Sequence, residues 1–290
     1  MPRSRLTAGA LSLPWSLTFL IFWAFPVVYS LLLGFTDYTL ISKTGWNWVG
    51  LGNFRALFSD PTFTGAIKQT LLFVIGTIPV TTAISLLMAL LVNRRFKGRG
   101  LFRAGYFIPS ITSMVVIALI FTNLYQRGGY IYLLAQMIGF TPPEYGFLLS
   151  DSTALLSIMG MDVWMSVGYY MLIFLAGLKS IPDELYEAAE LSGASAWRQF
   201  WSITLPLLRP VALYIIVINS IKSFQVFVEI LVMTSGKFDT MTMVYFIWEK
   251  GLTTGFESGY ASAAAYILFC ITALFSIILF GFLRKRQQVW

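Results

Sequence analysis

Long apolar runs alternate along the chain with shorter segments that hold the turn-forming residues and nearly all of the charge. A helix needs about 20 apolar residues to cross the hydrocarbon core of a bilayer. The pattern therefore predicts an all-α polytopic membrane protein, with six transmembrane helices in one domain over residues 1–290. The predicted spans are 13–35, 71–92, 106–125, 154–178, 211–233 and 260–283. Pro26 and Pro79 fall inside the first two and are expected to kink them.

Composition agrees with this pattern and excludes several classes of protein. Hydrophobic residues make up 57% of the chain and charged residues 11%, whereas about 25% of a soluble domain is charged. The net charge of +7 comes from short basic clusters between apolar runs, not from the basic face that a nucleic-acid-binding domain needs. The chain has no His, which removes His-based catalysis, and no metal site is expected. Its lone Cys270 is expected to be a small buried thiol.

The distribution of Lys and Arg predicts the orientation in the membrane. With the N-terminus inside, the inner segments hold about twice as many Lys and Arg residues as the outer segments. The richest inner segment, 94–103, follows the second predicted span. Both termini are therefore expected in the cytoplasm, and the even number of spans agrees with this. The apolar run within 1–33 is too long for a signal peptide and lacks a cleavage site, so it is expected to be retained as a helix.

The cytoplasmic segment 179–208 between the fourth and fifth predicted spans is too polar to cross a membrane. Ser180 and Asp183, with Pro182 in the first turn, predict the start of a short helix. Gly193 is expected to end that helix, because glycine adopts a positive φ without steric cost.

A second short helix is expected after this elbow. Ser195 can cap it, and the pair Leu205-Pro206 is expected to help end it. Ala188 and Ala189 leave a smooth surface beside Glu187 on the first helix.

This segment resembles the EAA loop of ABC importer permeases: Glu-Ala-Ala, three residues, Gly, then an apolar residue and Leu-Pro. The matching positions are Glu187, Ala188, Ala189, Gly193, Ile203, Leu205 and Pro206. The resemblance implies a coupling helix that docks in a cleft of a separate ATPase subunit. The docking residues that it implies are Glu187, Ala188, Ala189, Glu190, Leu191, Gly193 and Ala194.

Further segments resemble the carbohydrate-type permeases of this group, of the maltose and oligosaccharide class. They are 50–54, 175–182 and 259–263. Segment 234–238 reads Thr-Ser-Gly-Lys-Phe, where that group often has Thr-x-Gly-Gly-Pro. The departure puts in doubt this outer turn and its contact with a binding protein, but not the family.

What the resemblance implies for fold and partners is a five-helix permease core with an extra N-terminal helix. Such a subunit works beside a second, homologous permease, two ATPase subunits and an extracytoplasmic solute-binding protein, in a bacterial or archaeal cytoplasmic membrane. The chain has no phosphate-binding Gly-x-x-x-x-Gly-Lys-Ser/Thr loop. ATP and magnesium are therefore expected on the partner ATPase, with no catalytic residue and no cofactor in this chain.

Ionisable residues inside the predicted spans are costly and usually face a cavity or a partner. In the fifth span Asn219, Lys222, Ser223 and Val226 follow helical spacing on one face, and Glu229 lies one turn further. On the fourth span Asp162 and Tyr169 share a face, and Tyr169 could stack on a sugar ring. We expect these residues to line a substrate path: Asp162, Tyr169, Asn219, Lys222, Ser223, Val226 and Glu229.

Four alternatives remain open from the sequence. Lys222 could instead form an internal ion pair with Glu229 or Asp162 that only holds helices together. The solute could be a polyamine or a phosphate ester. An ion-coupled secondary transporter would use the same charges, but such proteins usually show inverted repeats, which this sequence lacks. A membrane enzyme would need a polar catalytic cluster, for which the sequence offers few candidates.

Overall fold

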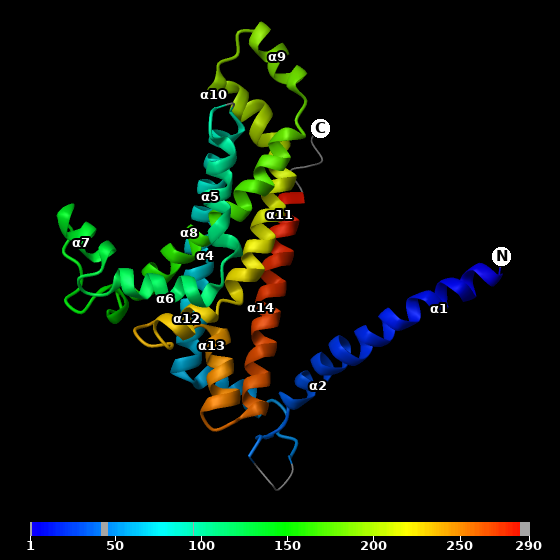
Figure 1. Cartoon of the computed structure of the whole chain (residues 1–290). Helices are drawn as coiled ribbons and strands as arrows, with labels where there is room; N and C mark the ends of the chain where they lie inside the picture. The colour runs from blue at the N-terminus through cyan, green and yellow to red at the C-terminus, as the bar shows by residue number, and fades with distance from the viewer. Residues whose placement is uncertain (1, 42–45, 95, 285–290) are drawn as a thin grey trace. The chain divides into compact units, whose positions relative to one another are not determined.

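Apart from two isolated β-bridges, the regular structure that the computed structural model describes is helical. The described residues are 2–41, 46–94 and 96–284 (Figure 1). Within them, five helices are long and apolar enough to cross a membrane: Leu11–Leu33, Pro61–Asn93, Ala154–Lys179, Ala196–Phe224 and Ser258–Leu279. The bent pair Arg99–Ile111 and Met114–Tyr125 makes a sixth if it counts as one span. The predicted all-helical polytopic fold is confirmed.

By its internal contacts the chain divides into two compact units. One comprises Met1–Thr64 and Phe246–Cys270, and the other comprises Gly65–Tyr245 and Ile271–Trp290. The division passes through the two long helices α4 (Pro61–Asn93) and α14 (Ser258–Arg284). The prediction of a single domain stays a prediction, and the units are described separately.

The first unit joins the N-terminal helices to the start of α14. It contains α1 (Pro2–Phe19), a π-helical turn (Leu20–Ala24), α2 (Phe25–Leu33), α3 (Gly52–Ser59) and a second π-helical turn (Glu249–Thr253). The segment after α2 is fixed to α3, since the Asn53 side-chain amide donates hydrogen bonds to the carbonyls of Gly34 and Thr36. Hydrogen bonds from Asn47 lower the pKa of the exposed Asp37 carboxyl in the same segment.

Gly259 allows α14 to approach the end of α2 closely. Its N–H donates to the Tyr38 carbonyl, and a Cβ built on it would lie 2.2 Å from the Thr36 carbonyl oxygen. The conflict is with backbone, so a side chain at this position has no flexible neighbour to displace.

Replacing Gly259 with alanine is therefore expected to destabilise this junction by about 1–3 kcal/mol, the usual cost of overpacking. Thermal unfolding of the detergent-purified protein should show the loss as a lowered Tm. The matched control is Gly281→Ala in the same helix, where an added Cβ meets nothing within 4 Å. Equal melting temperatures for the two variants would contradict the close approach.

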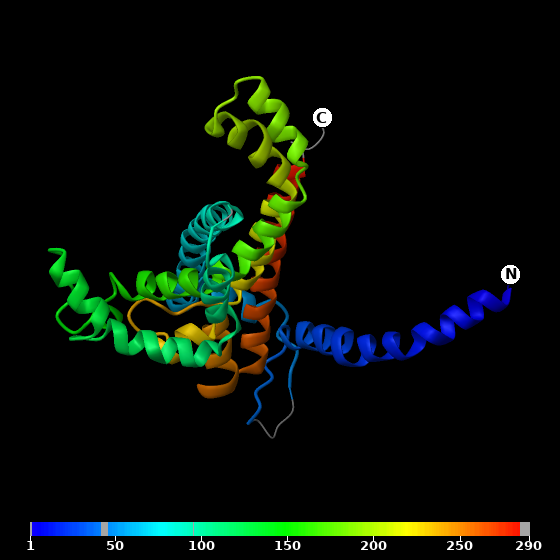
Figure 2. The same ribbon diagram turned by 45° about the horizontal axis from the view of Figure 1, so that its top comes forward.

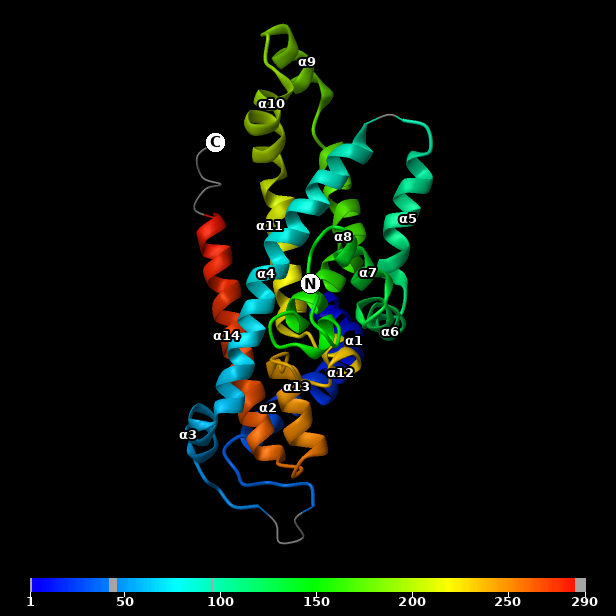
Figure 3. The same cartoon turned by 90° about the vertical axis from the view of Figure 1, so that its left-hand side faces the viewer.

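The second unit is organised around α8 (Ala154–Lys179), the most buried of the membrane-length helices. This helix packs against α5 (Arg99–Ile111), α6 (Met114–Tyr125), α11 (Leu205–Phe224) and α12 (Val228–Met233). Gly168 faces the α5 backbone, where a Cβ would overlap the Tyr106 carbonyl. Figures 1 and 3 show α4 and α5 running alongside α8 and α11 within this unit. Its other helices are α7 (Tyr130–Met137), α9 (Asp183–Leu191) and α10 (Ala196–Gln199), whereas α13 (Met243–Trp248) is divided between the two units after Tyr245.

Two predicted spans are not continuous helices. The third bends by 99° between α5 and α6, where Thr112 takes an extended conformation three residues after Pro109. The fifth ends at Phe224 instead of continuing to Met233, and α12 begins only at Val228. Tertiary bonds hold this break, since Thr242 Oγ1 donates to the Val226 carbonyl. Helical spacing alone could not indicate either interruption.

Two Pro residues follow π-helical turns instead of ending helices. Leu205 N–H donates to the carbonyl of Phe200, five residues back, directly before Pro206; Phe25 N–H bonds to Leu20 in the same way before Pro26. Proline lacks an N–H, and a π turn accommodates the missing bond within a continuing helix. The expectation that Leu205-Pro206 helps to end the second short helix is therefore wrong. A further correction concerns Cys270, which is exposed on α14 and not buried.

Candidate functional site

The loop between α8 and α11 projects beyond the ends of both helices (Figures 1 and 2). Its first helix is α9, which begins with Asp183 and Glu184, carboxylates that suit the positive end of a helix dipole. Pro182 is the N-cap residue rather than part of the first turn. Ser180 does not cap α9, since its hydroxyl donates to the Gly177 carbonyl at the end of α8.

The predicted elbow is confirmed at Gly193. Its φ is +75°, and its N–H donates to the Glu190 carbonyl. Ala194 N–H then donates to the Ala189 carbonyl and closes the helix end. Ser195 caps α10 as predicted, since its hydroxyl accepts the Arg198 N–H.

The predicted docking residues lie together on and just after α9. Glu187, Ala188, Glu190, Leu191 and Gly193 are exposed, and Ala189 and Ala194 are half-buried. Leu191 is 92% exposed, although it is a large apolar side chain in a polar loop. The loop therefore presents an acidic face with an apolar tip, a combination that suits docking to another protein.

An exposed aromatic cluster that lies on α10 and the following turn was not predicted from the sequence. Trp197 contacts Phe200 and Trp201 ring to ring, and both tryptophans are exposed. The signal was present, because two tryptophans four residues apart in a polar loop lie on one face of a helix.

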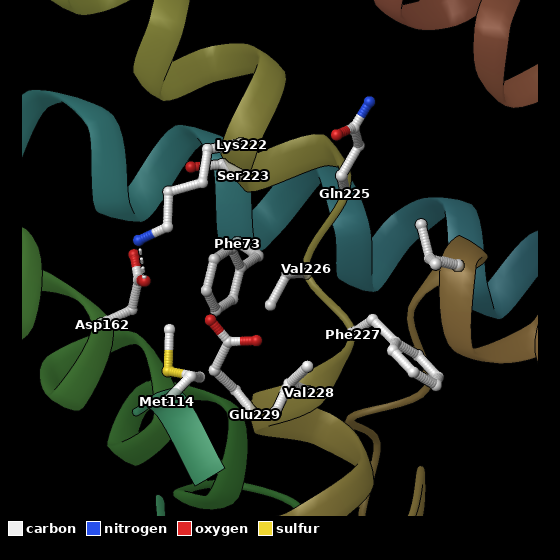
Figure 4. A pocket seen from close by; sticks show the side chains of 11 residues that line it. Phe73, Met114, Asp162, Lys222, Ser223, Gln225, Val226, Phe227, Val228 and Glu229 are labelled. Atoms are coloured by element: carbon white, nitrogen blue, oxygen red, sulfur yellow. Dashed lines mark hydrogen bonds and ion pairs between the residues drawn. The ribbon is translucent and has the colours of Figure 1, made fainter. Parts of the chain in front are cut away.

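Three of the polar residues predicted for a substrate path, Asp162, Lys222 and Glu229, come together at the α8–α11–α12 junction. Lys222 Nζ lies 2.7 Å from Asp162 Oδ1 and donates to Ser166 Oγ, also at 2.7 Å. The Asp162 side chain is 2% exposed and the Lys222 side chain 39% exposed. Figure 4 shows the two side chains extending toward each other, with Glu229 on the α12 side of the same cavity.

Two cavities border this pair. The larger, of about 520 Å³, is lined by Asp162, Lys222, Ser223, Val226 and Glu229 together with Phe73, Met114 and other apolar side chains. The smaller, of about 270 Å³, is lined by Tyr169 and Lys222 together with Ser166 and Ser110. Lys222 therefore lines both cavities while it is paired. The internal ion pair with Asp162, left open by the sequence, is present, whereas no Lys222–Glu229 pair occurs among the described residues.

Asn219 differs from the other predicted path residues. It is fully buried and lines neither cavity. Its side-chain amide makes no hydrogen bond within the described part of the chain. The prediction that it shares one helical face with Val226 and Glu229 is wrong, because α11 ends at Phe224. Val226 and Glu229 reach the larger cavity through the break in the helix instead.

The turn after α12 has an unusual backbone. Ser235, Gly236, Phe238 and Asp239 have positive φ values, and a Cβ on Gly236 would lie 2.4 Å from the Tyr245 ring. A side chain at position 236 would therefore collide with the Tyr245 ring, and only glycine fits there. No group of three or more His, Cys, Asp or Glu residues that could hold a metal occurs in the described ranges.

Comparison with known proteins identifies the family. Residues 81–287 match the model of the binding-protein-dependent transport system inner membrane component. The chain belongs to this family. It is a multi-pass inner-membrane permease subunit of a transporter and not an enzyme, as the loop 179–208 predicted.

The similarity to relatives and to solved structures extends over nearly the whole chain. The probable ABC transporter permease YesP of Bacillus subtilis is 31% identical, and the match covers 99% of this chain and 92% of the relative. The arabinooligosaccharide permease AraP of Bacillus subtilis is 32% identical, over 91% of this chain and 84% of the relative. A bacterial alginate ABC transporter superposes with a TM-score of 0.85 at 24% identity, covering 99% of this chain and 96% of that one.

Proposed function

We propose that this chain is one of two transmembrane subunits of an ABC importer that carries a carbohydrate delivered by an extracytoplasmic binding protein. The loop 179–208 faces the cytoplasm with both termini. A partner ATPase, which binds ATP and magnesium, docks on α9 (Asp183–Leu191). The observation that carries this proposal is the projecting helix α9, whose exposed acidic face and elbow at Gly193 match the EAA loop.

The carbohydrate assignment rests on relatives and on the charges in the cavities. AraP is named for arabinooligosaccharides and LacF of Rhizobium radiobacter, at 28% identity, for lactose. In the cavities Lys222 is already neutralised by Asp162, and Glu229 adds a second carboxyl group. The described residues that line the two cavities therefore include no free cation, and Tyr169 offers an exposed ring beside hydroxyl groups. A neutral sugar fits that balance better than an anion does.

A phosphate ester remains the second candidate. The sn-glycerol-3-phosphate permease UgpA of Agrobacterium fabrum is 31% identical over 83% of this chain. Such a dianion would meet two buried carboxyl groups and no unpaired lysine among the residues that line the two cavities.

Reconstitution can separate these candidates. The chain is co-expressed with its partner ATPase, second permease and binding protein, and the purified complex is placed in liposomes. The probes are radiolabelled arabinotriose, lactose and maltotriose, with sn-glycerol-3-phosphate in parallel. We expect ATP-dependent uptake of at least one neutral sugar and no ATP hydrolysis by this chain alone. Uptake of the phosphate ester only would reject the carbohydrate assignment, and robust hydrolysis by the isolated chain would reject the permease role.

A further inference from the structure

The helix α9 is held to the rest of its unit by few contacts. None of its residues is buried, and only Tyr186 and Ala189 are even half-buried. Its chain connections are the short link to α8 and the elbow at Gly193, where a positive φ marks a sharp change of direction. A force applied to α9 can therefore reach the membrane helices through these links or through the Tyr186 side chain.

Tyr186 contacts the helices in two ways. Its ring packs against the buried cluster that contains Leu178, Ile181 and Leu208. Its hydroxyl lies 2.9 Å from Thr204 Oγ1, within hydrogen-bond distance. Thr204 is buried and Tyr186 is half-buried, so this bond is partly shielded from water and is stronger than a fully exposed one. The hydroxyl of Tyr186 thus faces the membrane helices, not the exposed side of α9.

Thr204 occupies the joint at the base of α11. It is the last residue of the π-helical turn Phe200–Thr204 and the N-cap residue of α11. Pro206, two residues on, has no N–H to contribute to the helix, so this joint has fewer backbone hydrogen bonds than a regular helix. At the other end of α11, Lys222 bonds to Asp162 on α8. A rotation or shift imposed on Thr204 would thus be carried along α11 to the cavities.

We infer that Tyr186 and Thr204 are positioning residues whose hydrogen bond transmits movement of α9 to α11. This inference rests on the proposed docking of an ATPase on α9. In it, the acidic face of α9 binds the ATPase, and the Tyr186–Thr204 bond converts displacement of α9 into displacement of α11. Without the bond, α9 can move with the ATPase while α11 stays in place.

Tyr186→Phe and Thr204→Val test the inference, because each removes one hydroxyl and keeps nearly the same shape. In the reconstituted complex, each variant is expected to lower uptake of the neutral sugar mixture (arabinotriose, lactose and maltotriose) per ATP hydrolysed by about three- to tenfold, the range of one neutral hydrogen bond. Stimulation of ATP hydrolysis by the binding protein should fall alongside it. The double variant should lose no more than either single one, as expected for two halves of one bond.

Tyr214→Phe is the matched control, since Tyr214 is a half-exposed tyrosine on the same helix α11 that forms no hydrogen bond among the described residues. It should leave the coupling unchanged. Co-purification of the ATPase should survive in all four variants, because the docking face is intact. Loss of the ATPase from Tyr186→Phe, additive losses in the double variant, or normal coupling in both single variants would each overturn the inference. Failure of the wild-type complex to retain an ATPase would instead reject the proposed function.

Discussion

Replacing Gly193 with proline is expected to abolish ATP-driven uptake while the membrane helices stay inserted. Gly193 has a φ of +75° and donates its N–H to the Glu190 carbonyl. Proline is fixed near −65° and has no N–H, so it can neither adopt this conformation nor make this bond. The elbow must then open and move the end of α9. The measurements are co-purification of the ATPase and uptake per complex, and we expect both to fall by tenfold or more, because displacement of α9 removes the whole proposed docking face at once.

Gly193→Ala provides the graded control. An alanine Cβ at this position meets nothing within 4 Å. Its cost is therefore the left-handed backbone alone, about 1–2 kcal/mol. Alanine should weaken the coupling but not abolish it. If the proline and alanine variants behave alike, the geometry of the elbow is not what positions α9.

Charge on the docking face can be tested independently of backbone geometry. Glu187→Lys reverses an exposed carboxylate on α9 without changing helix propensity much. If the ATPase cleft is complementary to this acidic face, the variant should lose the ATPase in pull-down experiments, more strongly at low ionic strength. Glu144→Lys, at an exposed position outside the loop, is the control and should retain it.

The backbone of the loop 179–208 was well predicted, because it depends on interactions between residues close together in the sequence. Gly193 and Ser195 act on the residues beside them, so their roles as elbow and cap could be inferred from sequence alone. The exception is Pro206, which was predicted from the sequence to help end the second short helix. A π turn lets the helix continue through Pro206, and rules for neighbouring residues do not predict such a turn.

The arrangement of the proposed path residues could be predicted only in part, because it does not follow from neighbouring residues. The sequence could single the residues out, since a lysine and two carboxyl groups inside apolar runs are expensive and seldom lack a role. Their common helical face was wrong, because helical spacing assumes a continuous helix through Val226 and Glu229. At the break after Phe224, Thr242 Oγ1 donates to the Val226 carbonyl, a contact between residues 16 positions apart that helical spacing does not predict. The sequence could not show whether Lys222 pairs with Asp162 or with Glu229, because that choice also depends on the tertiary structure.

The Lys222–Asp162 pair allows stability and transport to be separated. Lys222→Leu leaves Asp162 buried without its cation, and its Oδ2 already has no hydrogen-bond partner among the described residues. Removing one partner of a buried ion pair costs about 3–5 kcal/mol. The yield of assembled complex is therefore expected to fall first, and fluorescence-detected size-exclusion chromatography measures it directly.

Adding Asp162→Leu to Lys222→Leu should restore the yield, because replacing a buried pair with apolar residues of similar volume is neutral or stabilising. Adding Glu229→Leu instead should not, since Glu229 is not the ion-pair partner of Lys222 among the described residues. Rescue by Glu229→Leu alone would contradict the observed pairing.

The rescued Lys222→Leu/Asp162→Leu complex can then show whether the two residues also act in transport. If Lys222 and Asp162 only hold α8 and α11 together, uptake per complex is normal in this variant. If they also bind the solute across the two cavities that Lys222 lines, uptake per complex stays low although the complex is stable. We expect the second result, because a purely structural pair would gain nothing from a lysine side chain that is 39% exposed and lines both cavities.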